Sequence, residues 1–352
     1  MNPHAGHTLP EPREDAPLVV WGAGAIGGSV AAFLARAGVP VRAVDIVPEH
    51  VQACRTAGLR IEGPVADFTQ RVEAVLPQAL HGRHACILLA VKAQHTERAL
   101  AQLLPHLAED GCVVSLQNGL GERLIAQRVG AHRTVAGFVN FAADYLEPGR
   151  IALGNRGALK VGEMQPGLTP RVHAVARVLR HFDPEAEAVA DIWPYKWGKL
   201  AYGSLLFATA LAHETMAETL ADPGLRALFV ELAREVIGVA ALDGVQPTGF
   251  DGFDPTAFAA GADPALAAAS LDRMAAHYRG STKQRSGVWR DLAVRRRKTE
   301  IDVQIGEIVR VAQAHGADAP VTATLVRLIR EVEEGRRAID RRNLTEFAAA
   351  LA

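Results

Sequence analysis

Val19-Val20-Trp21-Gly22-Ala23-Gly24-Ala25-Ile26-Gly27 is the stretch of this chain that decides its fold. An apolar run leads into a G-x-G-x-x-G loop, and a helical pattern of small and apolar residues follows at once. Gly22 allows the tight turn, Gly24 lets backbone N–H groups approach a pyrophosphate, and Gly27 lets helix and strand pack closely. The stretch therefore predicts a strand–turn–helix unit that binds a dinucleotide through Gly22, Ala23, Gly24, Ala25, Ile26 and Gly27.

The second strand-like run, Val41–Val44, supports this interpretation because it ends in an acidic residue, Asp45. A carboxylate at that strand end can accept hydrogen bonds from the ribose hydroxyls of an adenine dinucleotide. It would also repel a 2′-phosphate, and no basic residue follows before Arg55. The sequence therefore favours NAD(H) over NADP(H) as the cofactor.

Length and composition narrow the class of protein. The 352 residues suffice for two domains, and 49% hydrophobic with 22% charged residues is typical of a globular chain. The formal net charge of −1 gives no reason to expect nucleic acid or an anionic membrane as a partner. Three scattered cysteines without a C-x-x-C pair suit a reducing compartment, so we expect a cytoplasmic protein with no membrane span. Residues 1–16 lack an apolar signal core and are expected to form a disordered leader.

The first half of the chain alternates strand and helix patterns. Strands are predicted at Leu18–Trp21, Val41–Val44, Ala85–Val91, Cys112–Leu116 and Thr134–Val139, with helices between them at Thr96–Leu107 and Glu122–Val129 among others. Such alternation predicts an α/β fold with a parallel, doubly wound sheet of Rossmann type. Antiparallel edge strands are expected around Leu59–Glu62, Phe68–Val75, Ile151–Leu153 and Ala158–Val161.

From about residue 190 the pattern becomes helical. Helices are expected at Leu200–Ala212, from Asp222-Pro223 to Gly244, around Ile301–Ala312 and from Val321 towards Gly335, with a long loop at Thr248–Asp263. We therefore expect a dinucleotide-binding domain over residues 17–190 and an all-helical substrate and dimerisation domain over 191–352. A substrate cleft between the two, and a homodimer, complete the expectation.

Three polar residues are placed where chemistry could occur. Lys92 follows the strand Ala85–Val91, and Asn118 follows the next strand, so both are expected at the sheet edge where ligands bind. Lys199 begins an otherwise apolar helix, where burial could lower its pKa and make it a general acid. Each residue also has a plain alternative: a solvated lysine, an Asn-Gly turn and a charge at a helix end.

Taken together, five blocks of sequence resemble the ketopantoate reductase (2-dehydropantoate 2-reductase) family over roughly residues 17–335. The blocks are Gly22-x-Gly24-x-x-Gly27, Ala90-Val91-Lys92-Ala93, Leu116-Gln117-Asn118-Gly119, Trp197-x-Lys199-Leu200 and Thr299-Glu300-Ile301-Asp302. The resemblance implies hydride transfer from a reduced nicotinamide to the carbonyl of a 2-oxo acid. Through it, Lys199 matches the lysine that protonates the alkoxide, and Lys92 and Asn118 match residues that position nicotinamide and substrate. Glu300 matches the acidic group near lysine and cofactor.

The chain departs from the family's pattern around the substrate. Gly203 and Phe207 stand where the family has asparagines, and the paired serines read Ser286-Gly287. The spacing from Asp291 to Glu300 is one residue longer than the family's. Ser204 or Ser286 could take over the lost polar contacts; otherwise the chain reduces a different 2-oxo acid. We expect Lys92, Asn118, Lys199, Gly203 and Ser286 to contact the substrate.

Other interpretations remain open. A dehydrogenase of another hydroxy acid or an opine-like substrate fits the same two-domain plan, and a redox sensor could bind NAD(H) without turnover. A sensor has no need of Lys92, Asn118, Lys199 and Glu300 beside the nicotinamide. The basic run Arg295–Lys298 is expected to be a solvated helix face. His81 and His84 lack partner ligands, so no metal site is expected.

Overall fold

The computed structural model describes residues 9–281 and 283–351, which fall into two compact units, Met1–Ile192 and Trp193–Ala352. Of the expected disordered leader, residues 1–16, the first eight lie outside the described residues. Beyond them, Leu9 packs against the core of the first unit, and Arg13 and Ala16 exchange two backbone hydrogen bonds.

The first unit is built on an eight-stranded sheet with the order β12-β11-β8-β7-β6-β1-β2-β5. Its strands are β1 (Leu18–Trp21), β2 (Val41–Val44), β5 (Glu73–Val75), β6 (His84–Leu89), β7 (Leu107–Ser115), β8 (Thr134–Val139), β11 (Leu159–Glu163) and β12 (Glu187–Ala188). From β5 to β8 every pairing is parallel, whereas β11 runs antiparallel to β8. The order β5-β2-β1-β6-β7-β8 is that of the Rossmann fold, which confirms the expected fold class.

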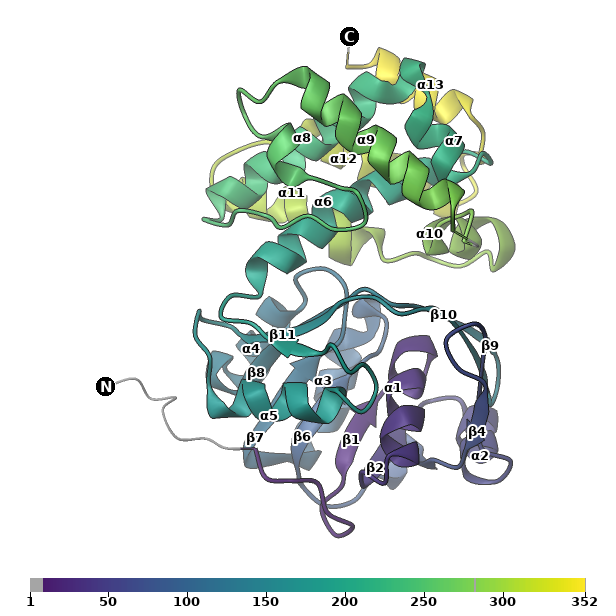
Figure 1. Cartoon of the computed structure of the whole chain (residues 1–352), viewed down its shortest axis with the longest axis vertical. Coiled ribbons are helices and arrows are strands. Elements are labelled where there is room, and N and C mark those ends of the chain that lie inside the picture. The colour runs from purple at the N-terminus through teal and green to yellow at the C-terminus, as the bar shows by residue number, and fades with distance from the viewer. Residues whose placement is uncertain (1–8, 282, 352) are drawn as a thin grey trace. The chain divides into compact units, whose positions relative to one another are not determined.

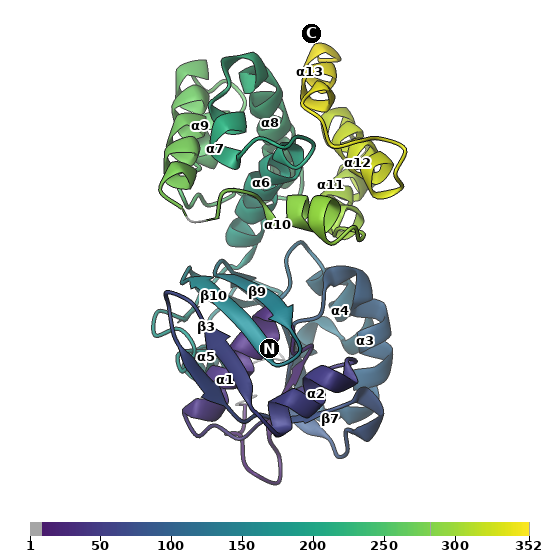
Figure 2. The same ribbon diagram turned by 90° about the vertical axis from the view of Figure 1, so that its right-hand side faces the viewer.

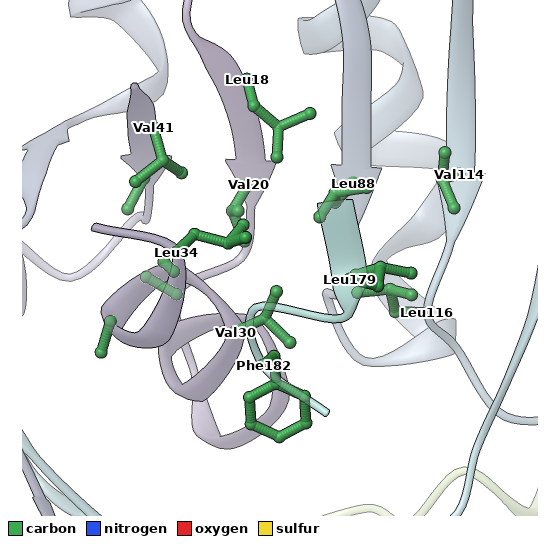
Figure 3. Close-up of a cluster of buried hydrophobic side chains, with 14 of the residues drawn as sticks. Leu18, Val20, Val30, Leu34, Val41, Leu88, Val114, Leu116, Leu179 and Phe182 are labelled. Atoms are coloured by element: carbon green, nitrogen blue, oxygen red, sulfur yellow. The ribbon is translucent and has the colours of Figure 1, made fainter. Parts of the chain in front are cut away.

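Alternating side chains of β1 serve the two faces of this sheet. Leu18 and Val20 belong to one apolar cluster, which includes α1 (Ala25–Arg36) and α5 (Pro170–Leu179). Val19 and Trp21 belong to a second cluster with α3 (Thr96–Leu103) and α4 (Glu122–Val129). Figure 3 shows the first cluster, and Figure 1 shows α1 and α5 on the near face of the sheet. A strand buried on both faces must be apolar throughout, as Leu18–Trp21 is.

The segments expected around Leu59–Glu62, Phe68–Val75 and Ile151–Leu153 contribute strands to a separate four-stranded sheet of order β4-β3-β10-β9, seen face-on in Figure 2. It comprises β3 (Leu59–Glu62), β4 (Phe68–Gln70), β9 (Ala142–Glu147) and β10 (Arg150–Asn155). The fourth expected segment, Ala158–Val161, falls in β11, which pairs antiparallel with β8 in the main sheet. The prediction of one antiparallel strand over Phe68–Val75 is wrong. The segment splits, and Glu73–Val75 becomes β5, parallel to β2 in the main sheet. Within the second sheet β3 and β10 are also parallel.

Several predicted boundaries shift. The helix expected over Thr96–Leu107 ends at Leu103 and passes into the 3₁₀ turn η3 (Leu104–His106). Pro105 explains this early end, because proline lacks the N–H that continues an α-helix. Leu107 instead begins β7, and β6 ends at Leu89 rather than Val91. The remaining elements of this unit are α2 (Pro48–Arg55), η1 (Pro77–Ala79), η2 (Ala93–His95) and η4 (Ala131–Arg133).

The second unit is helical, as expected. Its elements are α6 (Trp193–Thr209), α7 (Met216–Ala221), η5 (Pro223–Leu225), α8 (Arg226–Leu242), η6 (Pro255–Phe258), α9 (Pro264–Arg279), α10 (Gly287–Trp289), the π-helical turn η7 (Arg290–Val294), α11 (Ile301–Ala314), α12 (Pro320–Glu333) and α13 (Arg342–Ala349). In the part of the chain that the structure describes, none of the helices has the length and apolar character needed to cross a bilayer.

Two helix starts differ from the sequence prediction. α6 begins at Trp193, so Lys199 lies within the helix and not at its beginning. Pro194 accounts for this, because proline is favoured in the first turn of a helix. Asp222 caps η5 by accepting a hydrogen bond from Gly224 N at 2.8 Å, and the long helix α8 starts only at Arg226. α9 was not predicted; it lies directly after the expected loop.

The fold yields a stability prediction at the ion pair between Glu163 and Arg171, which are 8% and 7% exposed. Glu163→Gln leaves a buried guanidinium without its carboxylate and should cost about 3 kcal/mol of unfolding free energy. Glu187→Gln, at the exposed pair with Lys160 in the same sheet, is the matched control and should cost about 0.5 kcal/mol or less. Urea unfolding followed by circular dichroism measures both. Equal losses of unfolding free energy in the two variants would contradict the larger contribution assigned to the buried pair.

Candidate active site

The glycine loop of the first unit has the geometry that a pyrophosphate requires. Gly22 has φ +96°, and a Cβ there would lie 2.8 Å from Val91 N. A Cβ on Gly27 would lie 2.0 Å from Gly22 O, so helix α1 can approach the loop only without a side chain at that position. At Gly24, by contrast, a Cβ would meet nothing within 4 Å. Since Gly24 is also the N-cap of α1, this open space lies beside the helix N-terminus, where a dinucleotide phosphate fits.

Asp45 is fixed beside this loop by two backbone donors. Its Oδ2 accepts from Ala23 N at 2.9 Å and its Oδ1 from Val47 N at 3.0 Å. The structure therefore brings the acidic end of β2 next to the glycine loop. Each carboxylate oxygen has more than one acceptor position, so these bonds leave capacity for ribose hydroxyls.

Lys92 and Asn118 follow neighbouring strands, β6 and β7, at the carboxyl edge of the sheet. The order of the sheet reverses between β1 and β6, which is where open α/β sheets bind their ligands. Gln117, which the sequence analysis did not assign, connects the two loops. Its buried amide Nε2 donates to Val91 O at 2.7 Å and to Thr96 Oγ1 at 2.9 Å. Gln117 thus holds the segment that carries Lys92.

Lys199 lies in the middle of α6, in the second unit. Burial lowers the pKa of its ammonium to about 7, and the positive charges of Lys196 and Lys283 act in the same direction. Asp251 and Glu300 act in the opposite direction and raise the pKa. A lysine with a pKa near neutrality can donate a proton as the ammonium and accept one as the neutral amine at physiological pH.

The two acidic groups that act on Lys199 come from different elements. Glu300 immediately precedes α11. Asp251, which the sequence analysis missed, has φ +50° in a turn closed by a hydrogen bond from Phe253 N to Phe250 O at 2.9 Å. With Gly252 at φ +83°, this is a type I′ turn, for which Asp-Gly is a preferred pair. The Asp-Gly pair was the signal in the sequence that could have located it.

Gly203 lies one turn after Lys199 on α6, and a Cβ there would meet nothing within 4 Å. Ser204 has no exposed surface and donates its hydroxyl to Ala201 O at 2.7 Å, within its own helix. Phe207, at the next turn, is also buried. Position 203 therefore offers space and no polar side chain.

Ser286 also uses its hydroxyl locally. It is buried and caps α10, accepting a hydrogen bond from Trp289 N at 3.2 Å. The turn that follows, between Ser286 and Glu300, is the π-helical η7. Single π turns are often found at functional sites.

Residues 295–298 are exposed, as expected of a solvated run, but the expectation that they form a helix face is wrong. These residues follow η7 in irregular chain. Arg295 and Arg297 both contact the carboxylate of buried Asp291, at 3.1 and 2.9 Å, so local ion pairing decides their conformation. Among the described residues no group of three or more His, Cys, Asp or Glu side chains is arranged to hold a metal ion.

A Rossmann unit with an open dinucleotide loop, followed by a helical unit with a desolvated lysine, defines a nicotinamide-dependent oxidoreductase acting on a CH–OH/C=O pair. Two family models give the particular family: "Ketopantoate reductase PanE/ApbA" matches residues 18–166, and "Ketopantoate reductase PanE/ApbA C terminal" matches residues 191–333. The chain belongs to the ketopantoate reductase family.

Relatives and solved structures agree with this assignment. A 2-dehydropantoate 2-reductase of Archaeoglobus fulgidus is 29% identical over 318 residues, which cover 90% of this chain and 97% of the relative. A ketopantoate reductase structure from Ralstonia eutropha JMP134 has a TM-score of 0.76 at 27% identity, covering 91% of this chain and 99% of its own. D-mandelate dehydrogenase with NADH and anilino(oxo)acetate shares the fold, with a TM-score of 0.79 at 21% identity and coverage of 91% and 99%.

Asp251 gives a prediction that does not depend on turnover. Asp251→Asn removes a negative charge that favours the ammonium, so the pKa of Lys199 should fall further below its present value of about 7. Competitive acetylation across a pH series, read by mass spectrometry, measures the titration of this lysine. Asp272→Asn, at an exposed acid paired with Arg226, is the matched control and should leave it unchanged. A Lys199 that titrates at the same pH in both variants would refute the role of Asp251.

Proposed function

We propose that the protein reduces a 2-oxo acid with NADH, and that Lys199 protonates the oxygen that the hydride transfer leaves negative. The single observation that carries this proposal is the desolvated Lys199 on α6, with a pKa of about 7. A nearby ammonium stabilises a developing alkoxide and then supplies its proton. In the opposite direction the neutral amine would act as the base.

The other residues would bind and orient. A reduced nicotinamide, when bound, supplies the hydride. Gly22, Ala23, Gly24, Ala25, Ile26 and Gly27 would hold its pyrophosphate, and Lys92 and Asn118 would position nicotinamide and substrate from the carboxyl edge of the sheet. Glu300 favours the protonated state of Lys199 and so keeps the acid charged near neutral pH.

The preference for NADH rests on Asp45. Its carboxylate is fixed by Ala23 N and Val47 N, so it cannot turn away from a 2′-phosphate without breaking both hydrogen bonds. D-mandelate dehydrogenase, of the same fold, is described with NADH.

For the substrate we propose a 2-oxo acid other than ketopantoate, with an apolar group on its third carbon. Space without a polar side chain at Gly203, and an apolar Phe207 at the next turn, support this choice. A hydroxyl placed there would lose its bonds to water without a protein partner in return. Anilino(oxo)acetate, the ligand named with D-mandelate dehydrogenase, carries an aromatic group on a 2-oxo acid. Ketopantoate itself is the second candidate, because the named relatives are 2-dehydropantoate 2-reductases.

Three further expectations stay predictions: that the protein is located in the cytoplasm, that it forms a homodimer through the helical unit, and that it binds only small molecules as partners.

Absorbance at 340 nm with NADH, NADPH and a panel of 2-oxo acids tests the reaction. We expect turnover with acids that carry branched or aromatic side chains to exceed turnover with ketopantoate. Lys199→Ala should lower kcat by about 10²–10⁴-fold. Because Lys199 must be protonated to act, kcat for reduction should be level below pH 7 and fall as pH rises through about 7. If none of the 2-oxo acids causes NADH oxidation, the result would favour a redox sensor without turnover. Full activity of the Lys199→Ala variant would show that another group donates the proton.

Asp45→Ala tests the cofactor assignment. Without a charged acceptor for the ribose hydroxyls, the KM for NADH should rise by about tenfold or more. The ratio of kcat/KM with NADH to kcat/KM with NADPH should fall. Glu49→Ala removes an exposed carboxylate from the same segment and serves as the matched control. A cofactor ratio that Asp45→Ala does not change would remove the argument for NADH.

A further inference from the structure

Both backbone groups of Ala23, in the middle of the glycine loop, are held by side chains. Its N–H donates to Asp45 Oδ2 at 2.9 Å, and its carbonyl lies 2.8 Å from His50 Nε2. His50, on α2, has no exposed surface. We propose that His50 is a positioning residue for the dinucleotide: it fixes the peptide of Ala23, and through it the N–H groups that face the pyrophosphate. The inference rests on the dinucleotide site proposed above.

The hydrogen bonds determine the tautomer of His50. Gly149 N lies 3.0 Å from His50 Nδ1, and a backbone N–H can only donate. Nδ1 therefore accepts, the ring proton is on Nε2, and Nε2 donates to Ala23 O. Both ring nitrogens are thus satisfied, which a fully buried imidazole requires.

The turn that orients His50 is itself fixed by glycine. Gly149, between β9 and β10, has φ +81°, and a Cβ there would lie 2.7 Å from Ala53 Cβ on α2. The tight approach of this turn to α2 brings its N–H to Nδ1. Tyr145 of β9 adds a ring contact, with centroids 5.1 Å apart. The imidazole therefore joins the second sheet to the loop of the first.

This support matters because the next residue cannot fix itself. Gly24 is the N-cap of α1 but has no side chain to cap it, and its surroundings are open. Its orientation follows from the peptide before it. A carbonyl of Ala23 that turned away from His50 would turn the adjacent N–H of Gly24 with it, because the peptide unit is planar.

Two isosteres separate the two bonds of His50. In His50→Gln the side-chain amide nitrogen can replace Nε2 and keep the donor to Ala23 O. In His50→Asn the amide oxygen can replace Nδ1 and keep the acceptor for Gly149, but the donor is lost. Isothermal titration with NADH and with NADPH should show about tenfold weaker binding for His50→Asn and less than threefold for His50→Gln. At saturating cofactor, kcat should stay at the wild-type value in both, so the change is confined to cofactor Kd and KM.

His84→Gln is the matched control. His84 is also buried in the first unit, with its ring nitrogens 3.1 Å from two backbone carbonyls, of Pro17 and His81. The His84→Gln variant should be less stable than the wild type but should bind NADH with the same Kd. If His50→Asn does not fold, Gly149→Ala is the alternative variant. Its new Cβ would clash with Ala53 and displace the N–H that donates to His50 Nδ1, so the Kd for NADH should rise about threefold.

The outcomes are distinct. Equal weakening by both His50 variants, no weakening by His50→Asn, or the same weakening by His84→Gln would overturn the role of His50. A wild-type protein that binds neither dinucleotide would instead overturn the proposed function.

Discussion

The close approach of α1 to the end of β1 is the contact on which the rest of the first unit depends. The position of a Cβ on Gly27 lies 2.0 Å from Gly22 O, so any side chain there would push the helix off the strand. The same approach packs Val30 and Leu34 of α1 against Leu18 and Val20 and closes one core of the sheet. It also directs the uncapped N-terminus of α1 at open space. The packing of α1 and the open space at its N-terminus therefore come from one constraint.

The helical unit depends on a different balance. Taking a lysine out of water disfavours its ammonium, and two further cations near Lys199 add to that cost. Asp251 and Glu300 offset part of it, and the result is a pKa of about 7 where an exposed lysine would have 10.5. Burial acts most strongly, and the acids act against it. This is why the turn at Asp251 belongs to the site.

The sequence predicted best where local pattern and tertiary packing agree. β1, β2 and α4 have the predicted bounds, because an apolar run or an amphipathic period ends there at a loop residue. It predicted least where pairing decides. Glu73–Val75 could not be assigned to the main sheet, because the sequence of three residues does not determine which strand it pairs with, here β2. The positions of Gly22 to Gly27, Asp45, Lys92 and Asn118 at strand ends could be predicted because each follows an apolar run.

The strand pattern does not identify residues that act through a second residue. His50 and Gln117 act on backbone atoms of Ala23 and Val91, and such contacts exist only once the chain has folded. Asp251 acts on Lys199 through space. Chemistry and specificity are also separable in this site. Under the proposed function, Lys199 would transfer the proton, with its pKa set by Asp251 and Glu300, while the open position at Gly203 would admit the group beside the carbonyl. The proposed substrate would then require only the absence of a polar side chain one helical turn after Lys199.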